Sequence, residues 1–155
     1  MHRKIKIAFA ALALSAGFAG QAQAATSTVR LHTAADTTRF LSDTASGVTS
    51  MNKVNSSDLM QQWRKTDTSA GYATYTNVKT GRCLTGRGLQ GFPVVTSEKC
   101  VSGATKQQWR LGVSGDFQLR LNGLVASHNT AGNGTGVLMS LFTAKPNQKW
   151  HTHTP

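Results

Sequence analysis

A tripeptide that ends in tryptophan occurs three times in this chain and constrains its fold more than any other feature. The copies occupy residues 61–63, 107–109 and 148–150; two read Gln-Gln-Trp and the third reads Gln-Lys-Trp. They contain all three tryptophans, Trp63, Trp109 and Trp150, which stand 46 residues (63 to 109) and 41 residues (109 to 150) apart. A self-similar element at about this period predicts one supersecondary unit used three times.

Each tripeptide closes a similar stretch of sequence. A strand-like run is followed by a hydrophobic pair, a polar loop that contains glycine, and a second apolar strand. The first strands are expected at 28–31, 73–78 and 117–121, the pairs at 40–41, 83–84 and 124–125, and the second strands at 48 onward, 92–95 and 137–141. Residues two apart in a strand face the same side, so we expect the Gln and the Trp of each tripeptide to point inward together. Trp would fill a shared core, and the amides of Gln61 and Gln107 would bind loop backbone groups.

Three units that end in Gln-x-Trp resemble the repeats of the ricin B-type lectins. The second repeat is the closest match, because Cys83 and Leu84 open it, Cys100 follows its second strand and residues 107–109 end it. The resemblance covers residues 28–150. It implies an all-β fold, a β-trefoil with pseudo-threefold symmetry, whose repeats lie at roughly 27–67, 72–111 and 116–152.

The N-terminus has the pattern of a secretory signal peptide. Arg3, Lys4 and Lys6 precede an apolar stretch at 7–20, and a small-x-small site ends at Ala24. This stretch is too short and wrongly flanked for a membrane span. We therefore expect residues 1–24 to be a signal peptide and residues 25–155 to be one secreted domain with no transmembrane segment.

Cys83 and Cys100 are the chain's two cysteines. In an exported protein such a pair is expected to form a disulfide, and a metal or redox role for two cysteines at this spacing is disfavoured.

The chain is basic, with 17 Lys and Arg, 6 Asp and Glu and a net charge of +11. Loss of the three basic residues before Ile7 would leave 14 basic against 6 acidic residues, a net charge of +8. The basic residues are scattered and not interleaved with aromatics, which argues against specific nucleic-acid binding. The charge favours anionic surfaces such as acidic glycans, or simply keeps a secreted protein soluble.

The resemblance implies a shallow sugar pocket, at most one per repeat. Its usual residues are an Asp shortly after the opening pair, an aromatic residue on the following strand, and an Asn directly before Gln-x-Trp. In the third repeat Asn147 and Gln148 match this set, and Phe142 lies near the aromatic position. Ala126 stands at the Asp position, so a polar contact would have to come from His128 or from Asn129 in the Gly-rich loop that follows.

The other two repeats depart further from the family pattern. In the first repeat Ser42 stands at the Asp position, and Asp43 beside it either reaches the pocket or forms a turn with Gly47. Met60 replaces the Asn. The second repeat has lost all three ligand residues and is expected to act as scaffold. Its residues at the Asp, aromatic and Asn positions are Thr85, Glu98 and Lys106.

No catalytic, metal or cofactor site is expected. The six acidic residues are spread over separate loops, and no nucleophile elbow, zinc motif or phosphate loop is present. His151 and His153 form a His-x-His at the C-terminus that can hold a divalent metal only weakly, and a frayed polar tail is the favoured interpretation.

Two classes of function remain. The first is a secreted, non-catalytic lectin that binds glycans through one pocket at most, in the third repeat. The second is a trefoil that has lost sugar binding and acts as a protein-binding module, such as a hydrolase inhibitor or toxin subunit, or as a basic polyanion and cell-surface binder. The missing Asp in all three repeats favours the second class, and the retained Asn147 favours the first.

Overall fold

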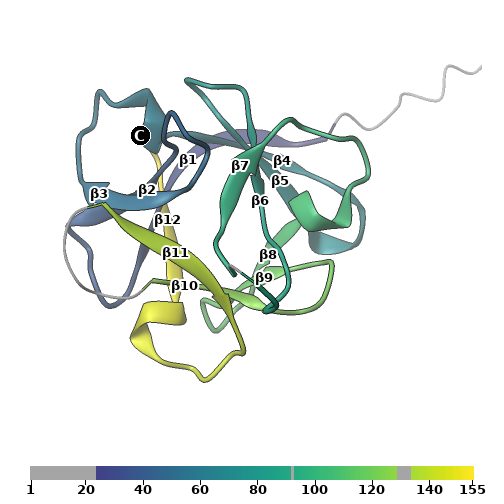
Figure 1. Cartoon of the computed structure of the whole chain (residues 1–155). Coiled ribbons are helices and arrows are strands. Elements are labelled where there is room, and N and C mark those ends of the chain that lie inside the picture. The colour runs from purple at the N-terminus through teal and green to yellow at the C-terminus, as the bar shows by residue number, and fades with distance from the viewer. Residues whose placement is uncertain (1–23, 92, 129–133) are drawn as a thin grey trace, which may run out of the picture.

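A computed structural model describes residues 24–91, 93–128 and 134–155, and the strands repeat in three sets of four (Figure 1). The first repeat contains β1 (Thr26–Thr33), β2 (Arg39–Ser42), β3 (Ser50–Lys53) and β4 (Trp63–Asp67). The second contains β5 (Ala73–Asn77), β6 (Cys83–Thr85), β7 (Thr96–Glu98) and β8 (Trp109–Leu111). The third contains β9 (Phe117–Leu119), β10 (Val125–His128), β11 (Thr135–Ser140) and β12 (Trp150–His153).

The first and last strands of the repeats form a barrel. Antiparallel pairing runs continuously through β12, β1, β4, β5, β8 and β9. The ring closes beside β9. There Trp150 N donates to Gly115 O at 2.7 Å, and the backbones of Asp116 and Lys149 form an isolated β-bridge. Both ends of the described chain thus lie in the barrel wall, with β1 between β12 and β4.

The middle strands form three hairpins, β2–β3, β6–β7 and β10–β11. The hairpins contact one another in a triangle. Strand β11 pairs with β3, Val48 bridges to Thr96, and Val94 bridges to Leu138. One hairpin from each repeat meets its two counterparts in this way, and together with the barrel this is the expected β-trefoil.

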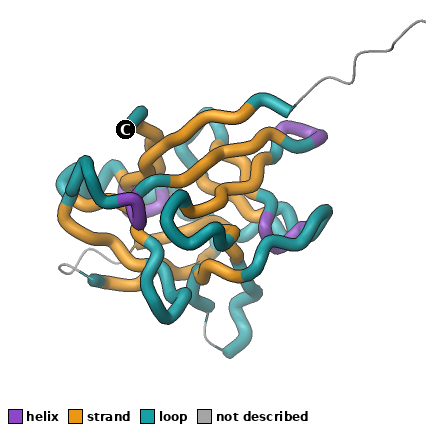
Figure 2. The backbone as a smooth tube through the Cα atoms, turned by 90° about the horizontal axis from the view of Figure 1, so that it is seen from above, coloured by secondary structure: helices purple, strands orange, loops and turns teal. Residues whose placement is uncertain are grey.

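Short 3-10 helices lie at the periphery (Figure 2). Three of them directly precede the last strand of a repeat: η1 (Leu59–Gln61), η3 (Thr105–Gln107) and η4 (Pro146–Gln148). A fourth, η2 (Ser69–Gly71), links β4 to β5. The expectation that the Gln of each tripeptide lies in a strand was therefore wrong: each Gln ends a 3-10 helix, and the strand begins at the Trp. Asp58 caps η1 by accepting a hydrogen bond from Met60 N.

The three glutamines make the same pair of backbone hydrogen bonds. Gln61 donates to Lys53 O at 2.8 Å and accepts from Asn55 N at 3.0 Å. Gln107 bonds to Lys99 O and Val101 N, and Gln148 to Leu141 O and Thr143 N, in the same way. Each amide thus satisfies two loop groups that β-pairing leaves free, which is the structural role proposed for it from the sequence.

The three tryptophans lie in one core and are at most 1% exposed. Each indole nitrogen donates at 2.9 Å to a backbone carbonyl of its own repeat. The acceptors for Trp63, Trp109 and Trp150 are Leu41, Leu84 and Ala126. The ring of Phe117 stacks on Trp109 at 4.9 Å between centroids, which ties the second and third repeats together.

These indole bonds also fix how the repeats align. Leu41, Leu84 and Ala126 are equivalent, so the opening pair of the third repeat is Val125 and Ala126 rather than Leu124 and Val125. Both candidate pairs begin with an apolar residue, and only the bond from Trp150 distinguishes them. This one-residue correction changes which side chains meet at the sugar pocket.

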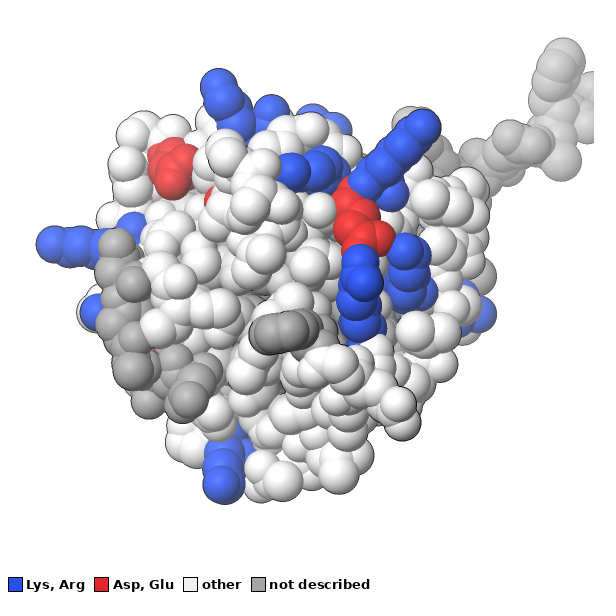
Figure 3. Space-filling model, viewed as in Figure 1, with Lys and Arg blue, Asp and Glu red and all other residues white. Residues whose placement is uncertain are grey.

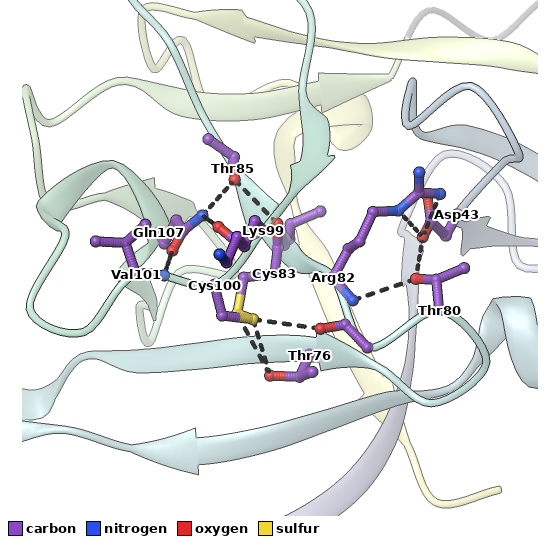
Figure 4. The surroundings of a disulfide bond; sticks show 12 residues. Asp43, Thr76, Thr80, Arg82, Cys83, Thr85, Lys99, Cys100, Val101 and Gln107 are labelled. Atoms are coloured by element: carbon purple, nitrogen blue, oxygen red, sulfur yellow. Dashed lines mark hydrogen bonds and ion pairs between the residues drawn. A yellow bond between two sulfur atoms is a disulfide. The ribbon is translucent and has the colours of Figure 1, made fainter.

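The predicted disulfide between Cys83 and Cys100 is confirmed, with the Cα atoms 5.0 Å apart (Figure 4). By the indole bonds, Cys83 is equivalent to Phe40 in the first repeat and to Val125 in the third. By the glutamine bonds to the residues on either side, Cys100 is equivalent to Val54 and to Phe142. The disulfide thus stands where the other repeats carry two apolar residues.

The predicted signal peptide lies almost entirely outside the described residues. Within 24–91, 93–128 and 134–155, no helix has the length and apolar character of a membrane span.

Candidate functional site

The repeats present three equivalent positions where the resemblance places a sugar pocket. The hydroxyl position follows the indole acceptor and is Ser42, Thr85 or Ser127. The amide position precedes the first Gln of each tripeptide and is Met60, Lys106 or Asn147. The facing position lies opposite the hydroxyl position on the neighbouring strand and is Ser50, Thr96 or Leu138.

In the third repeat these positions form a small, partly exposed site. Asn147 Nδ2 donates to Ser127 Oγ at 3.2 Å, which joins η4 to β10. Leu138 lies directly opposite Ser127 on β11 and is 36% exposed. The site therefore combines an amide, a hydroxyl and an apolar side chain. A hydroxyl and an amide can bind neighbouring sugar hydroxyls, and the apolar side chain can contact the face of the ring.

Gln148 is not available to a ligand, which corrects its placement among the sugar-binding residues. Its side chain is buried, and its amide is fully used. The oxygen accepts from the N–H and hydroxyl of Thr143, and the nitrogen donates to Ser140 Oγ and Leu141 O.

Phe142 is 43% exposed but occupies the position of Cys100, beyond the end of β11.

His128 is buried as well, and this too corrects the prediction. Its Nε2 lies 2.5 Å from Thr135 Oγ1, and burial lowers the pKa of the imidazole. Neighbouring residues of a strand point to opposite faces, so a residue directly after Ser127 on β10 points away from the pocket. Asn129 lies outside the described residues.

Asp43 serves the framework rather than a sugar pocket. Its side chain is completely buried. The carboxylate accepts from Arg82 Nη2 at 3.0 Å and from Thr80 Oγ1 at 2.6 Å (Figure 4). It also accepts from Ser97 Oγ. These partners all belong to the second repeat. The expectation that Asp43 reaches a sugar is therefore wrong, because its carboxylate is buried and accepts these hydrogen bonds inside the protein.

The second repeat fills its own pocket with charge. Glu98 accepts from Lys106 at 2.8 Å and from Arg87 at 2.7 Å. Burial alone would raise the pKa of Glu98, but the hydrogen bonds and charges of Lys106 and Arg87 lower it to about 2. Thr85, at the hydroxyl position, is buried and bonded to Cys83 O and Gln107. An ion-pair network thus stands where a ligand would have to enter.

The first repeat offers no better site. Ser42 is 1% exposed, and its hydroxyl donates to Asp43 O. Met60 supplies no hydrogen-bonding side chain at the amide position. Of the three equivalent places, the third repeat alone combines an accessible amide with an accessible hydroxyl.

Sequence reasoning missed Ser127 and Leu138 because it aligned the third repeat one residue early. Ala126 was assigned to the pocket, but it accepts the indole hydrogen bond and is buried. Strand alternation in β10 is the signal that could have identified Ser127. Ser127 lies two residues after Val125, so its side chain faces the same side of the strand as that of Val125.

The histidines at the C-terminus belong to a cluster rather than to a frayed tail. His153 Nε2 lies 2.8 Å from His32 Nε2, and the ring of His151 stacks on His32 at 5.4 Å. Burial lowers the pKa of His32, the hydrogen bond to Thr33 O opposes this, and His153 and His151 lower it further. Within the described part of the chain, no three His, Cys, Asp or Glu side chains are arranged to hold a metal ion.

Solved structures share this fold at low sequence identity. A mosquitocidal holotoxin aligns with a TM-score of 0.74 and 18% identity over 84% of this chain and 17% of its own. The designed threefold-symmetric protein ThreeFoil aligns with a TM-score of 0.67 and 21% identity over 81% of this chain and 96% of its own. The agglutinin from Abrus precatorius aligns with a TM-score of 0.66 and 19% identity over 83% of this chain and 48% of its own. These identities establish the fold alone.

The sequence itself matches a known family over most of its length. A search of curated proteins finds no match to this sequence. The family described as "Ricin-type beta-trefoil lectin domain" matches residues 21–151, which include all three repeats and all three tripeptides. The chain belongs to the ricin-type β-trefoil lectin domains.

Proposed function

We propose that this chain is a secreted, non-catalytic carbohydrate-binding domain whose sugar site is formed by Asn147, Ser127 and Leu138 in the third repeat. The observation that carries the proposal is the 3.2 Å hydrogen bond from Asn147 Nδ2 to Ser127 Oγ beside an exposed Leu138. Family membership and the sugar-binding neighbours of the fold support carbohydrate binding in general.

The site is small and lacks a carboxylate, so its binding is weak for a single sugar. Hydrogen bonds to charged groups contribute about twice as much as those between neutral groups. With a neutral hydroxyl at the Asp position and leucine in place of an aromatic ring, both principal contacts of a sugar pocket are reduced. Useful avidity then requires clustered glycans or several copies of the domain.

The distribution of carboxylates supports a non-catalytic role. Of the six acidic residues, Asp36, Asp43, Asp67 and Glu98 are in ion pairs. Asp58 caps a 3-10 helix. Glycoside hydrolysis by the usual route needs two carboxyl groups that face each other across the bond to be broken. These five are each committed to a structural partner.

Secretion is supported by the sequence pattern of residues 1–24.

The experiment is glycan binding by residues 25–155 and by two variants. Asn147→Ala removes the amide from the third repeat. Met60→Ala changes the equivalent position of the first repeat and leaves the net charge unchanged. We expect binding to a neutral glycan that resists added salt, is lost in Asn147→Ala and is retained in Met60→Ala. Equal binding by both variants, or no binding by the parent, would refute the site.

A second candidate is a protein-binding module. The positions where the family carries Asp hold Ser42, Thr85 and Ser127, so no repeat retains the full set of sugar ligands. Absence of glycan binding together with capture of a defined protein from the surrounding medium would favour this candidate.

A further inference from the structure

Two arginines stand together on the outer face of the β8–β9 hairpin. Arg110 pairs with Gln118, and Arg120 N donates to Gln108 O at 2.9 Å, so the two arginines are diagonal neighbours across the strands. Trp109 and Leu119, which alternate with them, point into the core. Both arginines are exposed. Strand alternation therefore places two guanidinium groups side by side on the outside of the barrel.

Tyr72 holds these two side chains near each other. The guanidinium carbon of Arg110 lies 5.4 Å from the centre of the Tyr72 ring, and that of Arg120 lies 5.3 Å from it. Cation–π attraction stabilises each contact. The ring carries no net charge, so it positions the two cations without neutralising them.

The hydrogen bonds of the two arginines go to neutral groups. Arg110 donates to Gln118 Oε1 and Arg120 to Gln108 Oε1, both at 2.5 Å. Neither forms an ion pair with any carboxylate in the described ranges, although Asp116 lines the same hollow as Arg110. A guanidinium has five N–H donors, so each arginine keeps donors for a ligand. By contrast, Arg39, Arg82 and Arg87 each have a carboxylate partner.

A shallow hollow adjoins Arg110. It has a volume of about 420 Å³ and is lined by Gly71, Arg110, Leu111, Gly112, Val113 and Asp116. It shares no residue with the site at Asn147. On the face shown in Figure 3 the basic side chains are dispersed, so net charge alone does not define a binding surface there.

We propose that Arg110 and Arg120, positioned by Tyr72, bind the sulfate or carboxylate group of an acidic glycan. The planar fork of a guanidinium matches the oxygens of either anion, and two forks held together can bind one anionic group or two neighbouring ones. The adjoining hollow then receives the ring of the next sugar. This inference rests on the proposed carbohydrate-binding function and names the class of glycan for a second surface of the domain.

The test compares Arg110→Gln/Arg120→Gln with Lys79→Gln/Lys99→Gln, which removes the same charge from two exposed lysines that have no ion pair. The probes are dextran sulfate, polygalacturonate and unmodified dextran at constant salt. We expect the arginine variant to bind the acidic probes roughly tenfold more weakly or worse, because lost hydrogen bonds to a charged group cost that much. The lysine variant should change binding much less. Dextran sulfate and polygalacturonate separate a preference for sulfate from one for carboxylate.

Three results would overturn the proposal: no binding of either acidic probe by the parent, equal binding by the arginine variant and the parent, or equal losses in both double variants. Asn147→Ala keeps this test separate from the proposed site in the third repeat. If Asn147→Ala loses neutral glycans while the arginine variant binds acidic probes normally, the inference fails and the proposed function stands. If only the arginine variant loses binding, the site at Asn147 fails and the inference stands.

Discussion

The carboxylate of Asp43 accepts hydrogen bonds from Nε and Nη2 of Arg82, at 3.2 and 3.0 Å, and this pair joins the first repeat to the second. The Asp43 side chain is fully buried, whereas that of Arg82 is 27% exposed. Gly47 completes the junction. Its backbone has a φ of +81°, and an added Cβ would lie 2.9 Å from Ser97 O, so only glycine fits there without a shift.

Replacing Asp43 with Ala should therefore destabilise the protein. Breaking a buried ion pair costs about 3–5 kcal/mol, and we expect about 3 kcal/mol because water can reach Arg82 once its partner is gone. Urea unfolding of both proteins measures the difference. The control is Asp67→Ala, since the Lys65–Asp67 pair is 34% and 45% exposed and should contribute less than about 1 kcal/mol. Where Asp43→Ala remains folded, its glycan binding should equal that of the parent; a selective loss of binding would restore Asp43 as a ligand.

Trp109→Ala should lower the free energy of unfolding by about 3–5 kcal/mol, the usual cost of a large core truncation. The indole is fully buried, stacks on Phe117 and donates to Leu84 O, so the change leaves both a cavity and an unpaired carbonyl. Thermal and urea unfolding provide the measurement. Val113→Ala is the control, since Val113 is fully exposed in the loop between β8 and β9. A parental melting temperature for Trp109→Ala would place the indole outside the stabilising core.

The fold was readable from the sequence because three tripeptides repeat one local pattern. Each repeat uses a Trp to fill the core and a Gln to bind two loop backbone groups. These two residues therefore recur once in every repeat, always two positions apart. The site was harder to predict. An error of one residue at Ala126 moved Ser127 out of the pocket, because Leu124 and Val125 are as apolar as the true pair.

Contacts between distant residues left no local signal. Asp43 and Arg82 are 39 residues apart, and His32 and His153 are 121 apart. From its neighbours in sequence, Asp43 is expected in a turn and His153 in a frayed tail. Strand pairing brings them together, and a single sequence does not state which side chains will meet across a barrel. The contacts of Tyr72 with Arg110 and Arg120 could not be predicted for the same reason, because the three residues lie on three different strands or at their ends.

The stability of the protein should fall as the pH decreases below 6.5. Burial lowers the pKa of both His32 and His128 below the value of 6.5 expected in the unfolded chain. The unfolded state then binds more protons than the folded state, so the stabilisation is complete above pH 6.5 and is lost as the pH falls toward the folded pKa values. The slope is at most about 1.4 kcal/mol per pH unit for each histidine.

Urea midpoints between pH 7.5 and 5.5 measure this dependence. His32→Phe keeps a ring beside Phe40, which lies 5.1 Å from the imidazole, and should flatten the pH profile. His128→Leu should flatten it independently, because the two imidazoles lie on different strands, His32 on β1 and His128 on β10. A parental stability that rises or stays constant as the pH falls below 6.5 would contradict the assignment of these histidines as neutral in the folded state.

Ser127→Asp should strengthen sugar binding at the third repeat, if Asn147 and Ser127 hold the sugar as proposed. The new carboxylate would lie beside Asn147, on a partly exposed position where it stays hydrated until a ligand binds. A charged hydrogen bond contributes about 1.5–3 kcal/mol, so we expect roughly tenfold tighter binding of a neutral glycan. Ser114→Asp, in an exposed loop, adds the same charge elsewhere and should leave the affinity unchanged. Adding Asn147→Ala to Ser127→Asp should remove the gain in affinity, because the amide and the carboxylate would hold neighbouring hydroxyls of one sugar. A gain in affinity that survives this change would mean that the carboxylate binds the glycan at a different place.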